Sequence, residues 1–182
     1  LAQPKWKGKI AVRSSGNTYN QSLMASVIAN SDQTKAETWA KSLVANFSRS
    51  PKGNDRDQVK EVAADRADIA IINTYYLGKL LNSENEQEVE AGKSVGLIFP
   101  NQENSGAHVN ISGIGVCKYA PNKDNAIQLI EYLLSDKVQE LYSAANYEYP
   151  IVKDIPICDL LQSWGSFRED TIDLDRKSTR LN

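Results

Sequence analysis

The sequence predicts an α/β protein with a largely parallel sheet. Short apolar runs of strand length alternate along the chain with segments whose apolar residues recur at helical spacing. One such run, residues 69–72, is β-branched apart from Ala70, the pattern of a strand buried on both faces. This alternation is typical of strands that are joined by crossover helices within one sheet.

Composition narrows the class further. The chain has 182 residues, of which 41% are hydrophobic and 24% are charged, so it can bury a core as one domain or as two small ones. The formal net charge is -2, and the lysines and arginines are scattered, which argues against a nucleic-acid partner. The longest apolar run is only a few residues, too short to span a membrane.

The first half of the chain is expected to contain two strand-to-helix junctions. Each expected helix starts at a residue that can cap its free N–H groups. The expected elements, in order, are a strand at 9–13, a helix capped by Asn20, a helix opened by the capping box 34–37 with the apolar stripe Trp39, Leu43, Val44 and Phe47, a helix capped by Asn54, the strand 69–72 and a helix capped by Thr74.

The second half is expected to be less regular. The acidic run 84–90 indicates a solvated loop or helix end. The remaining expectations are a strand at 95–100, an extended segment at 107–118 broken at 112–113, helices capped by Asp124 and Asp136, and a loop-rich stretch after Pro150.

Two adjacent tyrosines, Tyr75 and Tyr76, lie where the strand 69–72 gives way to a helix. In doubly wound proteins, ligands bind outside the carboxyl ends of such strands. A deprotonated phenol is a hard anionic donor suited to Fe(III); because its pKa is near 10, only a strongly Lewis-acidic ion would ionise it at neutral pH. The alternative is one core ring and one surface ring, which is common for amphipathic tyrosines.

Tyr19 lies at a second junction of the same kind, after the strand 9–13. The loop before it contains Ser15, Gly16 and Asn17, which offer a hydroxyl, an amide and free N–H groups at a helix start, a suitable cradle for an anion. The alternative is a plain turn rich in helix-capping residues.

Other reactive side chains give weaker signals. Asp55 and Asp57 are acidic residues at a helix start, where they suit the macrodipole and need no catalytic role. His108, the only histidine, is interpreted as a structural residue outside any metal site. Cys117 and Cys158 form no CxxC pair, so we expect two buried or half-buried free thiols, although a disulfide is permitted in an oxidising compartment.

Several ordered motifs together resemble one known family. They are WKGKI at 6–10, RSSGNTYNQSL at 13–23, GNDRDQ at 53–58, ADIA at 67–70, NTYYLG at 73–78, GAHVNISG at 106–113 and NYEYP at 146–150. In this order and over nearly everything from Lys5 to about Asp175, they resemble the ferric-ion-binding substrate-binding proteins of bacterial ABC transporters.

The resemblance implies a periplasmic-binding-protein fold of type II, with two lobes around a cleft joined by crossover strands. In that family a secretion signal and a first lobe precede the segment that here is residue 1, so the chain is expected to be a fragment. It then comprises the second lobe at 1–105, a returning segment of the first lobe with a hinge at 106–155, and a return to the second lobe at 156–175. Residues 176–182 depart from the family pattern and are expected to be a non-native tail.

The resemblance also implies function: a binding protein, not an enzyme, that captures Fe(III) in the cleft and delivers it to an inner-membrane ABC permease. Family ligand positions map onto Tyr75 and Tyr76 and, in the tyrosine-rich subgroup, onto Tyr19. Residues expected to orient the phenolates or to hold a companion anion such as carbonate are Arg13, Ser15, Asn17 and Asn73. The resemblance further implies a monomer in the periplasm, whose remaining iron ligands lie in the first lobe.

Two rival functions stay open at this point. The same lobes would suit an oxyanion or a small organic molecule, with the tyrosines stacking on it. A hydrolase would use the loop 14–16 as its nucleophile or phosphate site, but the sequence contains no G-x-S-x-G elbow and no Walker A motif to support it.

Overall fold

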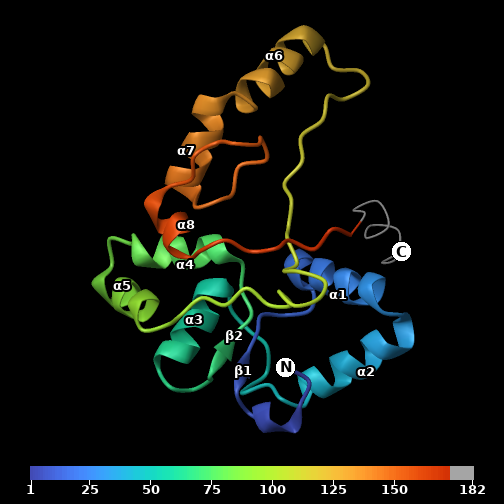
Figure 1. The fold of residues 1–182 in the computed structure, drawn as a ribbon, viewed down its shortest axis with the longest axis vertical. Coiled ribbons are helices and arrows are strands. Elements are labelled where there is room, and N and C mark those ends of the chain that lie inside the picture. The colour runs from blue at the N-terminus through green and yellow to red at the C-terminus, as the bar shows by residue number, and fades with distance from the viewer. Residues whose placement is uncertain (173–182) are drawn as a thin grey trace. The chain divides into compact units, whose positions relative to one another are not determined.

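The structure is a computed structural model, and it describes residues 1–172 (Figure 1). The chain divides into two compact units, which are described separately below. Unit 1 comprises Leu1–Asn110 and the segment that begins again at Phe167, and unit 2 comprises Ile111–Ser166. These divisions differ from the predicted boundaries at 105/106 and 155/156, and the assignment of either unit to a lobe stays a prediction. The predicted tail 176–182 lies outside the described residues.

A parallel pair of short strands lies at the centre of unit 1. Strand β1 (Ile10–Ala11) pairs with β2 (Ile69–Ala70), with Ile10 opposite Ile69 and Ala11 opposite Ala70 (Figure 1). The predicted strands 9–13 and 69–72 are thus confirmed as parallel neighbours, although both are shorter. β1 is buried, but β2 is only half-buried, so the prediction of burial on both faces is wrong. Within residues 1–172 the sheet has two strands, which leaves β2 at an edge.

Helices make up most of the regular secondary structure in both units. Unit 1 contains the 3-10 helix η1 (Pro4–Trp6), α1 (Thr18–Asn30), α2 (Gln33–Val44), α3 (Asp55–Ala63), α4 (Thr74–Leu81) and α5 (Glu86–Lys93), and unit 2 contains α6 (Lys123–Leu133), α7 (Asp136–Asn146) and α8 (Asp159–Ser163).

The start of α3 confirms the predicted cap, whereas α1 and α2 start earlier than predicted. Asn54 forms a capping box with Asp57. Asn17, not Asn20, caps α1, since its Oδ1 accepts from the N–H of Tyr19 at 3.0 Å. Asp32, not Thr34, caps α2. In both cases an Asn or Asp upstream can accept from the free N–H groups, and the helix extends back to it.

The caps of α4, α6 and α7 were also predicted one or two residues late. Their N-cap residues are Asn73, Asn122 and Ser135, and none of these makes a side-chain cap bond. Asp124 and Asp136 instead lie in the first turn, where a carboxylate interacts favourably with the helix dipole without accepting a cap bond.

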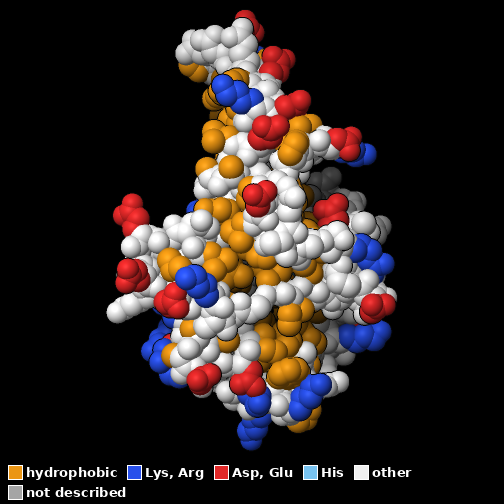
Figure 2. Space-filling view, turned by 60° about the vertical axis from the view of Figure 1, so that its left-hand side comes forward, with side chains coloured by type: hydrophobic (Ala, Val, Ile, Leu, Met, Phe, Trp, Pro, Cys, Tyr) orange, Lys and Arg blue, Asp and Glu red, His pale blue; other side chains and the backbone are white. Residues whose placement is uncertain are grey.

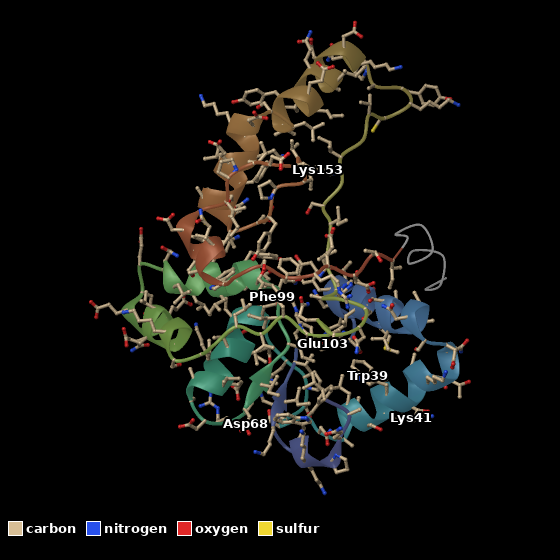
Figure 3. All side chains as sticks on the ribbon, viewed as in Figure 1. Trp39, Lys41, Asp68, Phe99, Glu103 and Lys153 are labelled. Carbon is tan, nitrogen blue, oxygen red and sulfur yellow. The ribbon has the colours of Figure 1, made fainter. Side chains whose placement is uncertain are left out.

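Two further predictions in unit 1 are wrong. The run 84–90 mostly forms α5, which Asn85 caps and which packs on α4. The segment 95–100 forms no strand, because it pairs with no other strand in the described chain. It is held instead by Phe99, labelled in Figure 3, whose ring stacks on that of Phe167 with centroids 4.2 Å apart.

Apolar side chains from β1, α3 and α4 form the core of unit 1. Ile10 and Leu80 are 0% exposed, and Val59 is 2% exposed. Trp39 and Leu43 on α2 face inward as predicted, but Val44 is exposed. At the opposite end of the sheet from the tyrosines, Lys9 and Asp68 form an ion pair of 2.6 Å that joins the starts of the two strands; Asp68 is labelled in Figure 3.

Unit 2 has a small core around α7 and α8. Val138 and Leu161 are buried, and the Oγ of Ser143 accepts from the N–H of Cys158 at 2.8 Å. Helix α6 buries no residue completely, and apolar side chains lie on the surface of the α6–α7 region (Figure 2). Both cysteines are free, as expected, but Cys117 is exposed, so the predicted burial is wrong there. No helix within residues 1–172 is both long and apolar enough to cross a membrane.

Candidate metal centre

The three predicted tyrosines lie together at the carboxyl end of the parallel strand pair. Tyr19 is in the first turn of α1, which follows β1, and Tyr75 and Tyr76 are in the first turn of α4, which follows β2. The hydroxyl of Tyr75 donates to the hydroxyl oxygen of Tyr19 at 2.9 Å. Parallel pairing therefore brings two junctions that are 56 residues apart to one edge, as strand topology predicts.

The tyrosine pair is not split between core and surface. The rings of Tyr75 and Tyr76 lie 4.3 Å apart between centroids, tilted by 36°. Both residues, like Tyr19, are half-buried. The plain alternative of one core ring and one surface ring is therefore wrong, and three phenols form a partly accessible cluster of oxygens.

This environment keeps the phenol of Tyr75 protonated. Burial, followed by hydrogen bonds to Tyr19 and Tyr76, raises the pKa of Tyr75 above its ordinary value of 10.0. The phenol of Tyr75 therefore ionises at neutral pH only when a cation takes the place of its proton. This position discriminates chemically, because only a strongly polarising cation repays the loss of that proton.

Arg13 adds positive charge beside the phenols. Its Cζ lies 5.6 Å from the centroid of the Tyr19 ring, and its Nη1 forms a short ion pair with Asp55. Burial lowers the pKa of Arg13, but the hydrogen bond and charge of Asp55, followed by those of Tyr76, raise it by more, so the net shift is upward. The guanidinium is therefore a permanent cation at this edge.

Lys79 places a second cation on the cluster. It is four residues after Tyr75 on α4, and its Nζ lies 5.4 Å from the centroid of that ring. Residues four apart on a helix are neighbours, so the position follows from helix geometry. Arg13 and Lys79 thus each place a positive charge close to one of the three rings, Arg13 at Tyr19 and Lys79 at Tyr75.

The predicted supporting residues divide into two groups. Arg13 and Asn73 are close to the tyrosines: Asn73 is the N-cap residue of α4, and its Oδ1 accepts from the side chain of Asn110 at 2.7 Å. Asn17 is occupied as the cap of α1, which favours the plain-turn interpretation of its loop. Ser15 is exposed in that loop and makes no hydrogen bond to a tyrosine within the described chain.

The sequence did not single out three neighbours of the cluster. Asp55 was interpreted only as a macrodipole residue, yet its side chain is 2% exposed and pairs with Arg13. Asn20 donates through Nδ2 to the carbonyl oxygen of Arg13 at 2.7 Å. Lys79 could have been found from its spacing to Tyr75. Nothing in the sequence pairs Asp55 with a residue 42 positions away.

The usual metal-binding side chains form no second candidate site within residues 1–172. No group of three or more His, Cys, Asp and Glu side chains in this part of the chain is arranged to hold a metal ion, and His108 belongs to no such group. Phenol oxygens are thus the donors that the described chain offers in a cluster.

Comparison with known proteins identifies a family. Residues 1–159 match the family described as bacterial extracellular solute-binding protein. The chain is 46% identical to iron uptake protein A1 of Synechocystis over 181 residues, which covers 100% of this chain and 50% of that protein. It is 27% identical to the major ferric iron-binding protein of Neisseria meningitidis over 150 residues, or 82% of this chain and 43% of that protein. The chain thus spans about half the length of these relatives.

Solved structures give the same result. A Trichodesmium protein (IdiA, FutA), in complex with iron and citrate ligands, is 48% identical and superposes with a TM-score of 0.94 over 98% of this chain and 56% of that chain. The ferric binding protein from Campylobacter jejuni is 42% identical, with a TM-score of 0.93 over 98% of this chain and 56% of that chain. These neighbours share the two-lobed fold of type II periplasmic ferric-binding proteins, which confirms the predicted fold class.

Proposed function

This chain belongs to the family of bacterial extracellular solute-binding proteins, and from that premise we propose that it captures Fe(III) through the phenol oxygens of Tyr19, Tyr75 and Tyr76. The complete protein then delivers the ion to an ABC permease in the inner membrane. The observation that carries the proposal is the cluster of phenols: Tyr19 and Tyr75 share a hydrogen bond of 2.9 Å, and the tilted ring of Tyr76 lies 4.3 Å from that of Tyr75 between centroids.

Charge balance supports a trivalent ion. Three phenolates carry the charge that neutralises Fe(III), whereas with a divalent ion these three ligands and the ion would together keep one negative charge. The raised pKa of Tyr75 acts in the same direction, because a weakly acidic cation cannot displace the proton. The relatives named for iron uptake and ferric-ion binding provide independent support for this ion.

The rest of the coordination sphere is proposed to come from outside unit 1. In the proposed arrangement, unit 1 is the tyrosine lobe and the segment that forms unit 2 returns to the other lobe, with the remaining ligands in the part of the relatives that this chain does not span. A companion anion would lie near Arg13, whose permanent charge suits carbonate or a carboxylate. This chain alone is expected to bind Fe(III) more weakly than the complete protein does.

Binding, not catalysis, is the proposed role. The matching family consists of solute-binding proteins. The loop 14–16, considered above as a nucleophile or phosphate site, leads directly into Asn17, the N-cap residue of α1, and Ser14 accepts through Oγ from the N–H of Gly16 at 3.2 Å. These are the contacts of a helix-capping turn.

Colour provides the test. Adding Fe(III) to the complete protein should produce a visible charge-transfer band from phenolate to iron, and titration should reach saturation at one ion per chain. Ga(III) has the same charge and a filled d shell, so it should bleach the band by competition without producing one of its own. Saturable iron binding without a visible band would contradict phenolate ligation, whereas the absence of saturable iron binding would favour an oxyanion or organic ligand.

A further inference from the structure

Asp55 occupies an unusual position for an acidic residue at a helix start. Asp55 is the first residue of α3, yet the whole residue is only 1% exposed and its side chain only 2% exposed. Both carboxylate oxygens are used: Oδ2 accepts from Nη1 of Arg13, and Oδ1 accepts from the N–H of Asn73 at 3.1 Å. A surface macrodipole residue needs neither of these contacts.

The two partners of Asp55 precede the two helices that carry the phenols. Arg13 lies between β1 and α1, and its carbonyl oxygen accepts from Nδ2 of Asn20 on α1 at 2.7 Å. Asn73 is the N-cap residue of α4. One carboxylate thus connects the chain leading to Tyr19 with the chain leading to Tyr75 and Tyr76.

Stability alone accounts poorly for such a pair. Removing two charges from water is costly, and a buried ion pair often contributes no more net stability than apolar side chains of the same volume. A carboxylate that accepts from two partners at once does, however, fix geometry, because it holds both partners at defined positions relative to each other.

We propose that Asp55 is a positioning residue of the tyrosine cluster: its carboxylate fixes Arg13 and the start of α4 relative to each other, so that the three phenol oxygens converge on one ion. The inference rests on the proposed function of the cluster as an Fe(III) site. Asp55 itself is not a ligand, since both of its oxygens are occupied by protein donors.

Asp57 provides a matched control. It lies in the same first turn of α3 and carries the same charge, but its Oδ2 accepts from the N–H of Asn54 at 2.7 Å within the capping box. Asp57→Asn therefore weakens the start of α3 without touching Arg13 or Asn73. Asp55→Asn keeps an oxygen for Asn73 but removes the charge that holds Arg13.

The test compares both variants with wild type in the complete protein, using chelator competition for Fe(III), two spectroscopic readouts and thermal unfolding. Asp55→Asn should bind Fe(III) about tenfold to a hundredfold more weakly in competition with a chelator, the usual range for residues that orient metal ligands. Its charge-transfer band should be displaced. In the iron-free protein, its tyrosine signal in near-ultraviolet circular dichroism should also decrease. Asp57→Asn should lower the unfolding temperature and leave all three properties unchanged.

Asp55→Glu covers the case in which Asp55→Asn does not fold. It keeps a counter-ion for Arg13 but moves the carboxylate by one methylene, so a folded protein with a displaced band supports positioning. Wild-type band, affinity and near-ultraviolet signal in either folded variant would overturn the inference, as would loss of the fold in both. A wild-type protein without a visible band would contradict the proposed iron site instead, and the near-ultraviolet comparison would still decide the role of Asp55.

Discussion

Unit 1 and unit 2 differ in how completely they bury their own apolar side chains. In unit 1, Ile10 and Leu80 are 0% exposed within a core built from β1, α3 and α4. In unit 2, Leu161 is equally buried, but α6 buries no residue, and Leu129 and Leu141 are 52% and 61% exposed. Both units contain helices with an apolar face, so the units differ in how much of that face packs against other elements of the same unit.

The two units also differ in charge pairing. All ion pairs between described side chains lie in unit 1, including the buried pair of Arg13 with Asp55. All three proposed iron ligands lie there as well. A unit that packs its own core can hold side chains in fixed positions, and a binding site needs that rigidity. Unit 1 is therefore where substitutions should have large effects.

The largest expected effect is on colour. Replacing both Tyr75 and Tyr76 by Phe should remove most of the phenolate-to-iron band of the complete protein, since two charged donors are lost while both rings remain to pack. Visible absorption during an Fe(III) titration measures this. Tyr119→Phe is the control from unit 2, where the residue is 84% exposed, and it should leave the band unchanged. An unchanged band in the double variant, or a lost band in the control, would contradict the assignment of the phenolate ligands to Tyr75 and Tyr76 in unit 1.

The next effect concerns stability, and it compares a buried apolar side chain of unit 1 with a half-exposed one of unit 2. Leu80→Ala should destabilise the chain by about 2–5 kcal/mol, because it removes a fully buried side chain and leaves a cavity. Leu129→Ala in unit 2 should change stability by less than about 0.5 kcal/mol, since that side chain is already half in water. Urea unfolding of the 182-residue chain measures both. Equal losses would show that unit 2 depends on its apolar face as much as unit 1 depends on its core.

Tyr19→Phe sharpens the comparison within unit 1. It removes one donor and the acceptor for the Tyr75 hydroxyl. In the complete protein, Fe(III) affinity should fall about tenfold, or ~1.4 kcal/mol, and the band should shift. Binding should also depend more on added carbonate or citrate, which can replace the lost negative charge. Unchanged affinity and unchanged anion dependence would make Tyr19 a packing residue and leave only the adjacent pair in the site.

Local patterns predicted the parts of this molecule that depend on neighbours in sequence. The strand at 69–72, the cap at Asn54 and the junction of Tyr19 all follow from residues within a few positions. Caps were misplaced where two candidates compete, as Asn17 and Asn20 do for α1. In such cases the winner depends on where the preceding loop is held, and here Asn20 is itself bonded to that loop.

Long-range pairing was beyond the sequence. Residues 95–100 alternate in exposure as a strand does, but strand formation requires a neighbouring strand, and the pattern does not say whether there is one. The same limit hid the role of Asp55. Its type and position suit a macrodipole residue, and only the tertiary fold brings Arg13 to it. The cluster of phenols was predictable because strand topology, a general rule, brings the two junctions together.

The smallest expected effect tests whether ion pairing contributes to the stability of unit 1 and not to that of unit 2. In unit 1, both oxygens of Glu61 accept at 3.0 Å from Arg66, and Arg49 lies 3.3 Å away. The hydrogen bonds from Arg66 are the main cause of a pKa of Glu61 that is lowered from 4.5 to about 2. Burial opposes this shift, and the charge of Arg49 adds to it. Because the folded pKa is the lower one, this carboxylate stabilises the fold above pH 4.5, and the contribution is lost as the pH falls through about 2. Arg66 is 59% exposed, so screening reduces the contribution to about 1 kcal/mol.

Glu61→Gln should therefore lower the free energy of unfolding by that amount at neutral pH and flatten its decline below pH 4.5. Glu140→Gln, at an exposed position in unit 2, should leave the profile as in wild type. Unfolding by urea at a series of pH values measures both, and parallel profiles for the two variants would show that this ion pair adds nothing to the stability of unit 1.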